Sequence, residues 1–270
     1  MKATVLIDNI GTDNLVNEWG LSIFVEYKDK KVLLDTGKSN KFLENAEKLG
    51  ADIAKVDYGV LSHAHYDHAD GLETFFTENK NANFYLQKGS KENCYKRVII
   101  FNKYIGIKKG TLEKYKDRII FAEGDYEISP GIMLLPHKTS GLEAIGKKKG
   151  MYVKRKNGWY PDDFSHEQSL VFDTEKGLVI FNSCSHGGAD NIINEVSKTY
   201  PDKKIYAIIG GFHLFSAKES EVRELAKRIE ATKIEKVYTG HCTGQNSYNI
   251  LKEELGDKIE QLRTGLTIEF

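Results

Sequence analysis

The sequence has little cysteine, no excess of charge of either sign and no long apolar segment. Its cysteines, Cys94, Cys184 and Cys242, are odd in number and widely spaced in a chain of 270 residues, which argues against a disulfide framework and favours a reducing compartment. The 39 Lys and Arg residues balance the 39 Asp and Glu residues, so neither a nucleic-acid nor a membrane partner is expected. No stretch approaches the roughly 18 apolar residues of a membrane span, and no secretory leader is recognisable at the start. The composition therefore predicts a cytoplasmic protein.

Short apolar runs alternate with amphipathic segments along the chain, without a visible repeat or an obvious linker. This alternation predicts a single α/β domain over residues 1–270, with helices covering sheets. The segment 138–160 differs, because it has seven Lys or Arg residues and Glu143 as its one acid; it is expected to be a long basic loop or a small hairpin. The expected strands are 3–8, 21–27, 30–37, 58–62, 82–88, two within 167–183, 203–214, 236–241 and 265–270, and the expected helices are 39–50, 71–80, 190–201, 216–231 and 245–256.

The stretch "LSHAHYDHADG" follows a predicted buried strand and is crowded with possible metal ligands. These are His63, His65, Asp67, His68 and Asp70. His63 and His65 are two positions apart, so both side chains can point to one side of an extended segment. Asp67 and His68 can turn towards a neighbouring point, so that one short loop could serve two adjacent cations. Asp70 lies beyond these four and is interpreted as the cap of the following helix.

The segment "HAHYDH" resembles the His-x-His-x-Asp-His signature of the metallo-β-lactamase superfamily, and "LLDTG" upstream is similar to the strand and turn that carry an acid beside the metal loop in that family. The resemblance implies a four-layer αβ/βα sandwich with a pair of divalent metal ions at one edge of the two sheets. Zinc is the expected metal, with iron and manganese as alternatives. Asp35 is the expected partner of one ligand histidine.

The resemblance also implies ligands far downstream of this loop. In "HEQSLVFDTEKGLVIFNSC", His166 precedes a strand pair and Cys184 ends it, which is similar to the zinc β-lactamases proper, where a cysteine serves the second metal. His241 in "VYTGHCTG" matches the late histidine of the family. His186 in "SCSHGG" is the alternative to His166, and the strand-pair spacing favours His166. The expected ligands are His63, His65 and His166 for the first ion and Asp67, His68, Cys184 and His241 for the second.

Two residues, His213 and Asp67, also have expected catalytic roles. His213 in "GGFHLF" ends an apolar strand, broadly where phosphodiesterase-type members of the superfamily carry a histidine that donates a proton to the leaving group. Asp67 is expected to orient the nucleophile, a metal-bound hydroxide. If His186 is not a ligand, it is expected to face the substrate.

The chain also resembles one subgroup of the superfamily, the 7,8-dihydropterin-6-methyl-4-(β-D-ribofuranosyl)-aminobenzene-5′-phosphate synthase-like proteins. The similar segments span nearly all 270 residues and occur in the expected order. They are "VLIDN", "EWGLSIFVE", "LLDTG", "NAEKLG", "LSHAHYDHADGL", "DDFSHEQSL", "SCSHGG", "GGFHL" and "TGHCTG".

The leading functional hypothesis is a metal-dependent hydrolase of a small molecule. The basic segment 138–160 could cover the metals and attract an anionic substrate such as a phosphate ester, while Trp159 and Tyr160 either stack on a heterocycle or anchor the segment. The alternatives are a synthase that condenses a pterin with a ribofuranosyl-aminobenzene phosphate and a non-catalytic metal-containing binding protein. A diiron redox protein is disfavoured, because His65 stands where such members tend to carry a glutamate. The sequence gives no expectation of oligomeric state.

Overall fold

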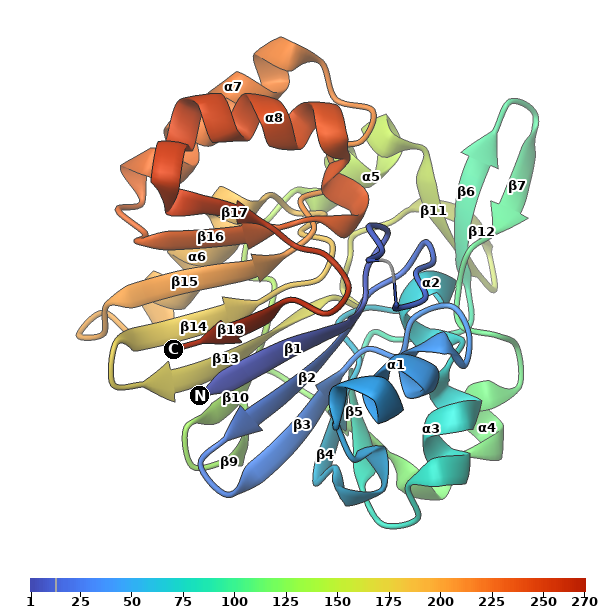
Figure 1. The fold of residues 1–270 in the computed structure, drawn as a ribbon. Helices are drawn as coiled ribbons and strands as arrows, with labels where there is room; N and C mark the ends of the chain where they lie inside the picture. The colour runs from blue at the N-terminus through green and yellow to red at the C-terminus, as the bar shows by residue number, and fades with distance from the viewer. Residues whose placement is uncertain (13) are drawn as a thin grey trace.

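The computed structural model describes residues 1–12 and 14–270, and two sheets form its centre (Figure 1). The first sheet begins with three antiparallel pairings and continues with parallel ones. Its order is β18 (Thr267–Glu269), β1 (Lys2–Ile7), β2 (Ser22–Tyr27), β3 (Lys30–Leu34), β4 (Tyr58–Val60), β5 (Asn83–Gln87) and β8 (Ile119–Ala122). Pairing of β18 with β1 brings the two chain ends together at one edge of this sheet.

The second sheet has the same division into an antiparallel and a parallel part. Its order is β17 (Ile259–Gln261), β16 (Lys236–Thr239), β15 (Ile205–Gly210), β14 (Gly177–Phe181), β13 (Gln168–Thr174), β10 (Ile132–Pro136) and β9 (Tyr126–Ser129). The facing sides of the two sheets are joined by apolar side chains from strands of both, including Val5, Ile23, Phe172 and Phe181, all at most 1% exposed. This shared layer fixes how the strand ends of one sheet face those of the other.

Helices cover the outer face of each sheet. The helices on the first sheet are α1 (Lys41–Leu49), α3 (Leu72–Glu78) and α4 (Thr111–Lys114), and those on the second are α6 (Ala189–Thr199), α7 (Glu219–Ala231) and α8 (Gln245–Leu255). Phe42 and Phe75 pack inward from the first set, and Ile192, Val222 and Leu251 from the second. The resulting order of helices, sheet, sheet and helices confirms the predicted four-layer sandwich. No helix in the described part of the chain is both long and apolar enough to cross a bilayer.

A smaller sheet projects from one side of the sandwich (Figure 1) and contains part of the basic segment. Its order is β12 (Gly158–Pro161), β11 (Met151–Arg155), β6 (Cys94–Val98) and β7 (Phe101–Tyr104). Residues 151–161 thus form the hairpin that was one of the two expectations, but the part before it is a helix, α5 (Leu142–Lys149), and not a loop. Lys147, Lys148 and Lys149 form its last turn, where positive charge interacts favourably with the helix dipole. Gly150, at φ 65°, ends the helix in the left-handed conformation.

Two helix starts differ from the sequence expectation. α7 begins at Glu219, three residues after the expected start at Ser216, because the Lys218 N–H donates to Glu221 Oε2 at 3.1 Å and Lys218 is the N-cap. Asp70 does not cap α3. It ends the short helix α2 (Tyr66–Ala69), and its Oδ1 accepts a hydrogen bond from the Lys108 N–H at 3.1 Å. Asp70 therefore fastens the histidine-rich loop to the segment that follows β7.

Candidate metal centre

The predicted site residues meet at one rim of the sandwich, where parallel strands of both sheets end. β3 ends just before Asp35, and β4 ends just before the histidine-rich loop. In the second sheet, β14, β15 and β16 end shortly before Cys184, His213 and His241 respectively. β13 runs antiparallel to β14, so the residues that precede β13 reach the same rim. The side chains gathered there are Asp35, His63, His65, Asp67, His68, His166, Cys184, His186, His213 and His241.

One group of donors consists of Asp67, His68, Cys184 and His241, all buried. His68 Nε2 lies 3.1 Å from His241 Nε2 and 3.3 Å from Cys184 Sγ. Asp67 Oδ2 lies 3.6 Å from His241 Nε2 and 3.8 Å from His68 Nε2. Donors bound tetrahedrally to zinc at about 2.0–2.3 Å stand roughly 3.3–3.8 Å apart. The separations among Asp67, His68 and His241, and that between His68 and Cys184, are therefore close to those in a tetrahedral ligand set.

The tautomers of the two histidines in this group explain why they need a cation. His68 Nδ1 donates to the Asp35 carboxylate at 2.7 Å, and His241 Nδ1 donates to Asn9 Oδ1 at 3.0 Å. The Asn9 amide is oriented by its own Nδ2 donating to the His241 carbonyl at 3.0 Å. In the neutral rings both Nε2 atoms then carry lone pairs that face each other. Such a contact requires a proton or a metal ion between the rings.

The electrostatics of His68 agree with this requirement. Burial alone would lower its pKa, but the Asp35 and Asp67 carboxylates outweigh burial and raise the pKa to about 9. His241 behaves in the opposite way, since burial and the neighbouring His68 hold its pKa well below the usual range. The space between the rings thus favours one positive charge, and a carboxylate orients one of the rings, as in the carboxylate–histidine–metal arrangements of metalloproteins.

A second group of donors consists of His63, His65 and His186, whose ring nitrogens lie within 4.8 Å of one another. The Nε2 atoms of all three are buried and have no hydrogen-bond partner in the described part of the chain. His63 Nδ1 pairs with Ser62 Oγ at 2.8 Å, and His186 Nδ1 pairs with a carboxylate oxygen of Glu167. Burial lowers the pKa of each ring, to about 3 for His65. They are therefore neutral near pH 7, which is the form that binds metals.

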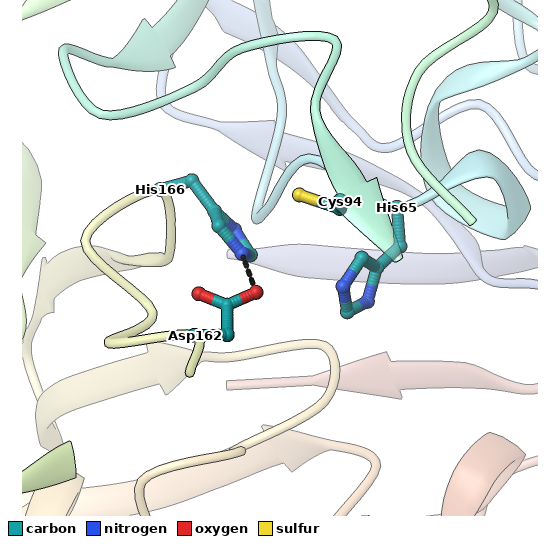
Figure 2. A group of neighbouring side chains, drawn as sticks. All are labelled: His65, Cys94, Asp162 and His166. Atoms are coloured by element: carbon teal, nitrogen blue, oxygen red, sulfur yellow. Dashed lines mark hydrogen bonds and ion pairs between the residues drawn. The ribbon is translucent and has the colours of Figure 1, made fainter. Parts of the chain in front are cut away.

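His166, the residue favoured by sequence spacing, is engaged elsewhere. Its Nδ1 accepts from the Ala64 N–H at 3.2 Å, and its Nε2 lies 3.1 Å from Asp162 Oδ2, beside Cys94 and His65 (Figure 2). Both nitrogens of His166 therefore have partners, whereas His186 Nε2 has none among the described residues, so the geometry favours His186 as the third donor beside His63 and His65. His166 also belongs to a separate donor group with His65, Cys94 and Asp162, so its role as a ligand stays a prediction.

Glu167 is a buried carboxylate beside the donor groups to which the sequence analysis gave no role. It is 1% exposed, and its two carboxylate oxygens pair with His186 Nδ1 and with His137 Nε2, the latter at 2.8 Å. The other ring nitrogen of His137, Nδ1, lies 3.2 Å from Glu195 Oε2. The available signal was an acid next to His166, immediately before an apolar strand. Glu167 thus fixes the tautomer of His186 and leaves its Nε2 free to bind a metal.

Replacing Glu167 with glutamine is expected to weaken metal binding about 10- to 100-fold, because the neutral amide no longer orients and polarises His186. Competition with a chromophoric chelator measures this affinity. Glu195→Gln is the matched control, since Glu195 contacts His137 and not His186. Equal losses in both variants would show that the network stabilises the fold without acting on the metal.

A cavity of about 160 Å³ opens directly onto both donor groups. His213 and Cys242 line it together with members of each group. His213 Nδ1 is buried and lacks a hydrogen-bond partner among the described residues, while its backbone N–H donates to Cys242 Sγ at 3.2 Å. Burial and nearby cations hold the pKa of His213 well below its usual range. His213 therefore lies at the mouth of the centre, with a ring nitrogen within 4.8 Å of possible ligand atoms of Cys184 and His186.

Backbone strain is concentrated at this rim. Asp35, His213 and His241 have φ values of 58°, 50° and 46°, in the left-handed region that residues other than glycine rarely occupy. Such conformations cost free energy and persist only where the surrounding structure enforces them. The strand ends thus hold the side chains in fixed positions before any ion binds.

The basic segment contributes less to this rim than expected. Lys148 and Lys149 line a second, larger cavity beside the centre, whereas Lys154 and Arg155 lie on β11, where they stack on Trp159 and Tyr160 respectively. The two aromatic rings line neither cavity. Their position on the small sheet agrees with the anchoring alternative.

Comparisons with known proteins agree with this geometry. The family model of the metallo-beta-lactamase superfamily matches residues 20–146. The crystal structure of Tm1679, "a metal-dependent hydrolase of the beta-lactamase superfamily", has 31% sequence identity, a TM-score of 0.85 and alignment over 100% of this chain and 99% of that one. The 7,8-dihydropterin-6-methyl-4-(beta-D-ribofuranosyl)-aminobenzene-5'-phosphate synthase of Methanocaldococcus jannaschii is 29% identical over 94% of this chain and 90% of its own. An N-acyl homoserine lactonase of a Bacillus species is 27% identical over 66% of this chain and 68% of its own.

Proposed function

Because the chain belongs to the metallo-beta-lactamase superfamily, we propose that it is a hydrolase that works with two divalent metal ions. The observation that carries the proposal is the pair of buried donor groups at one rim, above all the opposed Nε2 atoms of His68 and His241 at 3.1 Å. A thiolate, imidazoles and a carboxylate together suit zinc better than magnesium or calcium. One ion belongs to His63, His65 and His186, and the other to Asp67, His68, Cys184 and His241.

The chain's own groups divide the remaining work. Two zinc ions, when bound, supply Lewis acidity and lower the pKa of a coordinated water from 15.7 towards ~7. Asp67, which lies 3.6 Å from His241 Nε2, has a second carboxylate oxygen that can accept a hydrogen bond from the attacking water and orient it. His213, at the cavity mouth, is neutral in the free protein because burial lowers its pKa. An anionic substrate beside the ring raises that pKa, so that His213 can donate a proton to the departing group. The narrow cavity restricts the access of other water.

His213→Ala is expected to slow hydrolysis about 10²- to 10⁴-fold for substrates whose leaving group needs a proton, such as alkoxides. With a leaving group that is stable as an anion, such as p-nitrophenolate, the loss should be small. Steady-state kinetics on matched pairs of alkyl and p-nitrophenyl substrates measure the difference. A loss that is independent of the leaving group would contradict the role of proton donor.

The proposal is tested by metal content and turnover on the same preparation. After gentle purification near neutral pH, inductively coupled plasma mass spectrometry should find close to two metal ions per chain. The loaded protein is then assayed on phosphomonoesters, phosphodiesters, lactones and thioesters. Metal without turnover on any class would favour the non-catalytic binding protein, and absence of metal would refute the central claim.

A second candidate is a condensing synthase, because the methanogen enzyme aligns with 94% of this chain. The discriminating assay incubates the loaded protein with a dihydropterin diphosphate and a ribofuranosyl-aminobenzene phosphate and follows the products by mass spectrometry. A condensation product that requires both substrates and His186 supports the synthase. Release of phosphate or diphosphate alone supports the hydrolase.

A further inference from the structure

A cavity of about 680 Å³ adjoins the metal centre, and its lining has an excess of positive charge. It shares His186, His213 and Lys96 with the smaller cavity over the metals, so the two are contiguous. Its other charged lining residues are Lys148, Lys149, Asp190, Glu221 and Arg228.

Most of these charges neutralise each other. Lys148 pairs with Glu221 at 2.7 Å, and Arg228 Nε pairs with Asp190 at 2.7 Å. Lys96 and Lys149 remain, and within residues 1–12 and 14–270 neither forms an ion pair. Lys96 Nζ donates to the backbone carbonyl of Lys149, which places the Lys96 ammonium group at the end of α5, beside Lys149. Burial lowers the pKa of both ammonium groups, as expected for cations held away from water.

Two further features of the wall suit an anion. Gly187 and Gly188 lead into α6 and line the cavity, so the N-terminus of an 11-residue helix, which favours negative charge, lies at its wall. His213 Nδ1, buried and unpartnered among the described residues, lies on the same wall. Phe212, Leu214 and Leu225 supply an apolar part of the lining, and Ser185, Asn191 and Ser216 supply polar groups.

We propose that this cavity binds the phosphate group of a phosphorylated small molecule, with Lys96 and Lys149 as its two cationic contacts. Two uncompensated lysines match a phosphate monoester, which carries a charge of about −1.5 to −2 near pH 7, better than a carboxylate with a single charge. The apolar wall accommodates the body of the molecule, and the bond that reacts lies at the metals. The inference rests on the proposed function for the reaction, but the binding of the anion does not require turnover.

Equilibrium binding of phenylphosphonate to the metal-loaded protein, measured by calorimetry, tests the assignment. Lys96→Gln and Lys149→Gln are each expected to raise the dissociation constant about tenfold, because each removes one charge-assisted hydrogen bond. Lys147→Gln is the matched control, since this exposed neighbour lies on α5 and outside the cavity lining. Benzoate, with the same ring and one charge, should bind more weakly and depend less on either lysine.

Unchanged phosphonate affinity in both lysine variants would overturn the proposal, and so would equal affinity and equal lysine dependence for benzoate. A crystal structure of the complex that placed the phosphorus on the metals, away from Lys96 and Lys149, would overturn it as well. These outcomes are independent of the hydrolase proposal, because binding is measured without turnover. An absence of turnover on every substrate class, with lysine-dependent phosphonate binding, would reject the hydrolase and leave the phosphate site intact.

Discussion

Replacing His186 by glutamine is expected to leave the protein with one metal ion instead of two and to lower kcat/KM by roughly 10³-fold or more, equivalent to a loss of about 4 kcal/mol. Glutamine is close in size to histidine but is a poor zinc ligand. His186 Nε2 is buried beside His63 and His65 and has no hydrogen-bond partner in the described chain. The second ion, held by other residues, should remain.

His166→Gln provides the matched control for this experiment. His166 differs from His186 in having both nitrogens occupied, by the Ala64 N–H and by Asp162. A glutamine there can still accept the Ala64 hydrogen bond, so the variant should keep both metals and lose at most a few kcal/mol of stability. Metal content by mass spectrometry separates the two outcomes. Loss of one ion from His166→Gln, with both retained in His186→Gln, would restore the assignment that the sequence spacing favours.

The local part of the centre could be predicted from sequence because its geometry is set by consecutive residues. "HAHYDH" follows a strand, so the spacing within the motif fixes which side chains can point together. Cys184, His213 and His241 each follow the end of a parallel strand in the second sheet, where the fold brings loops to one rim. For these residues, the position along a strand was sufficient to predict the region in which they lie.

The choice between His166 and His186 depends on contacts that sequence spacing does not contain. The geometry that favours His186 comes from Glu167, which orients His186, and from Asp162, which holds His166 through its Nε2. Sequence spacing also does not reveal the contact of Lys96, which lies on the small sheet and donates a hydrogen bond to the carbonyl of Lys149, 53 positions later in the sequence. A basic run identified Lys149 as a candidate, whereas Lys96 had no comparable signal. Partners that are distant in sequence thus decide which candidates serve the site.

Stripping both metal ions is expected to lower the melting temperature by roughly 10 °C near pH 7.5. An ion present at 1,000 times its dissociation constant stabilises a folded protein by about 4 kcal/mol, and in a large domain each kcal/mol changes the melting temperature by about 2–4 °C. Without metals, the facing donors of His68 and His241 must also share a proton. Differential scanning calorimetry before and after chelation, followed by zinc readdition, measures the change. Unaltered melting after verified metal removal would contradict a metal centre between these side chains.

The metal-free protein should also lose stability as the pH falls below about 6.5. Burial is the main cause that lowers the folded-state pKa of His63, His65, His186 and His241, whereas in the unfolded chain each titrates near 6.5. Below that pH the unfolded chain binds more protons, so the free energy of unfolding decreases, by up to about 1.4 kcal/mol per pH unit for each histidine. Asp8 has the opposite effect, because burial raises its folded-state pKa to about 7 and the folded protein then binds its proton more strongly than the unfolded chain does. Its contribution offsets that of about one histidine. Urea unfolding of chelated protein at pH 7.5, 6.5 and 5.5 measures this slope, and a free energy of unfolding that is constant or rises towards pH 5.5 would show that these histidines take up protons in the folded state.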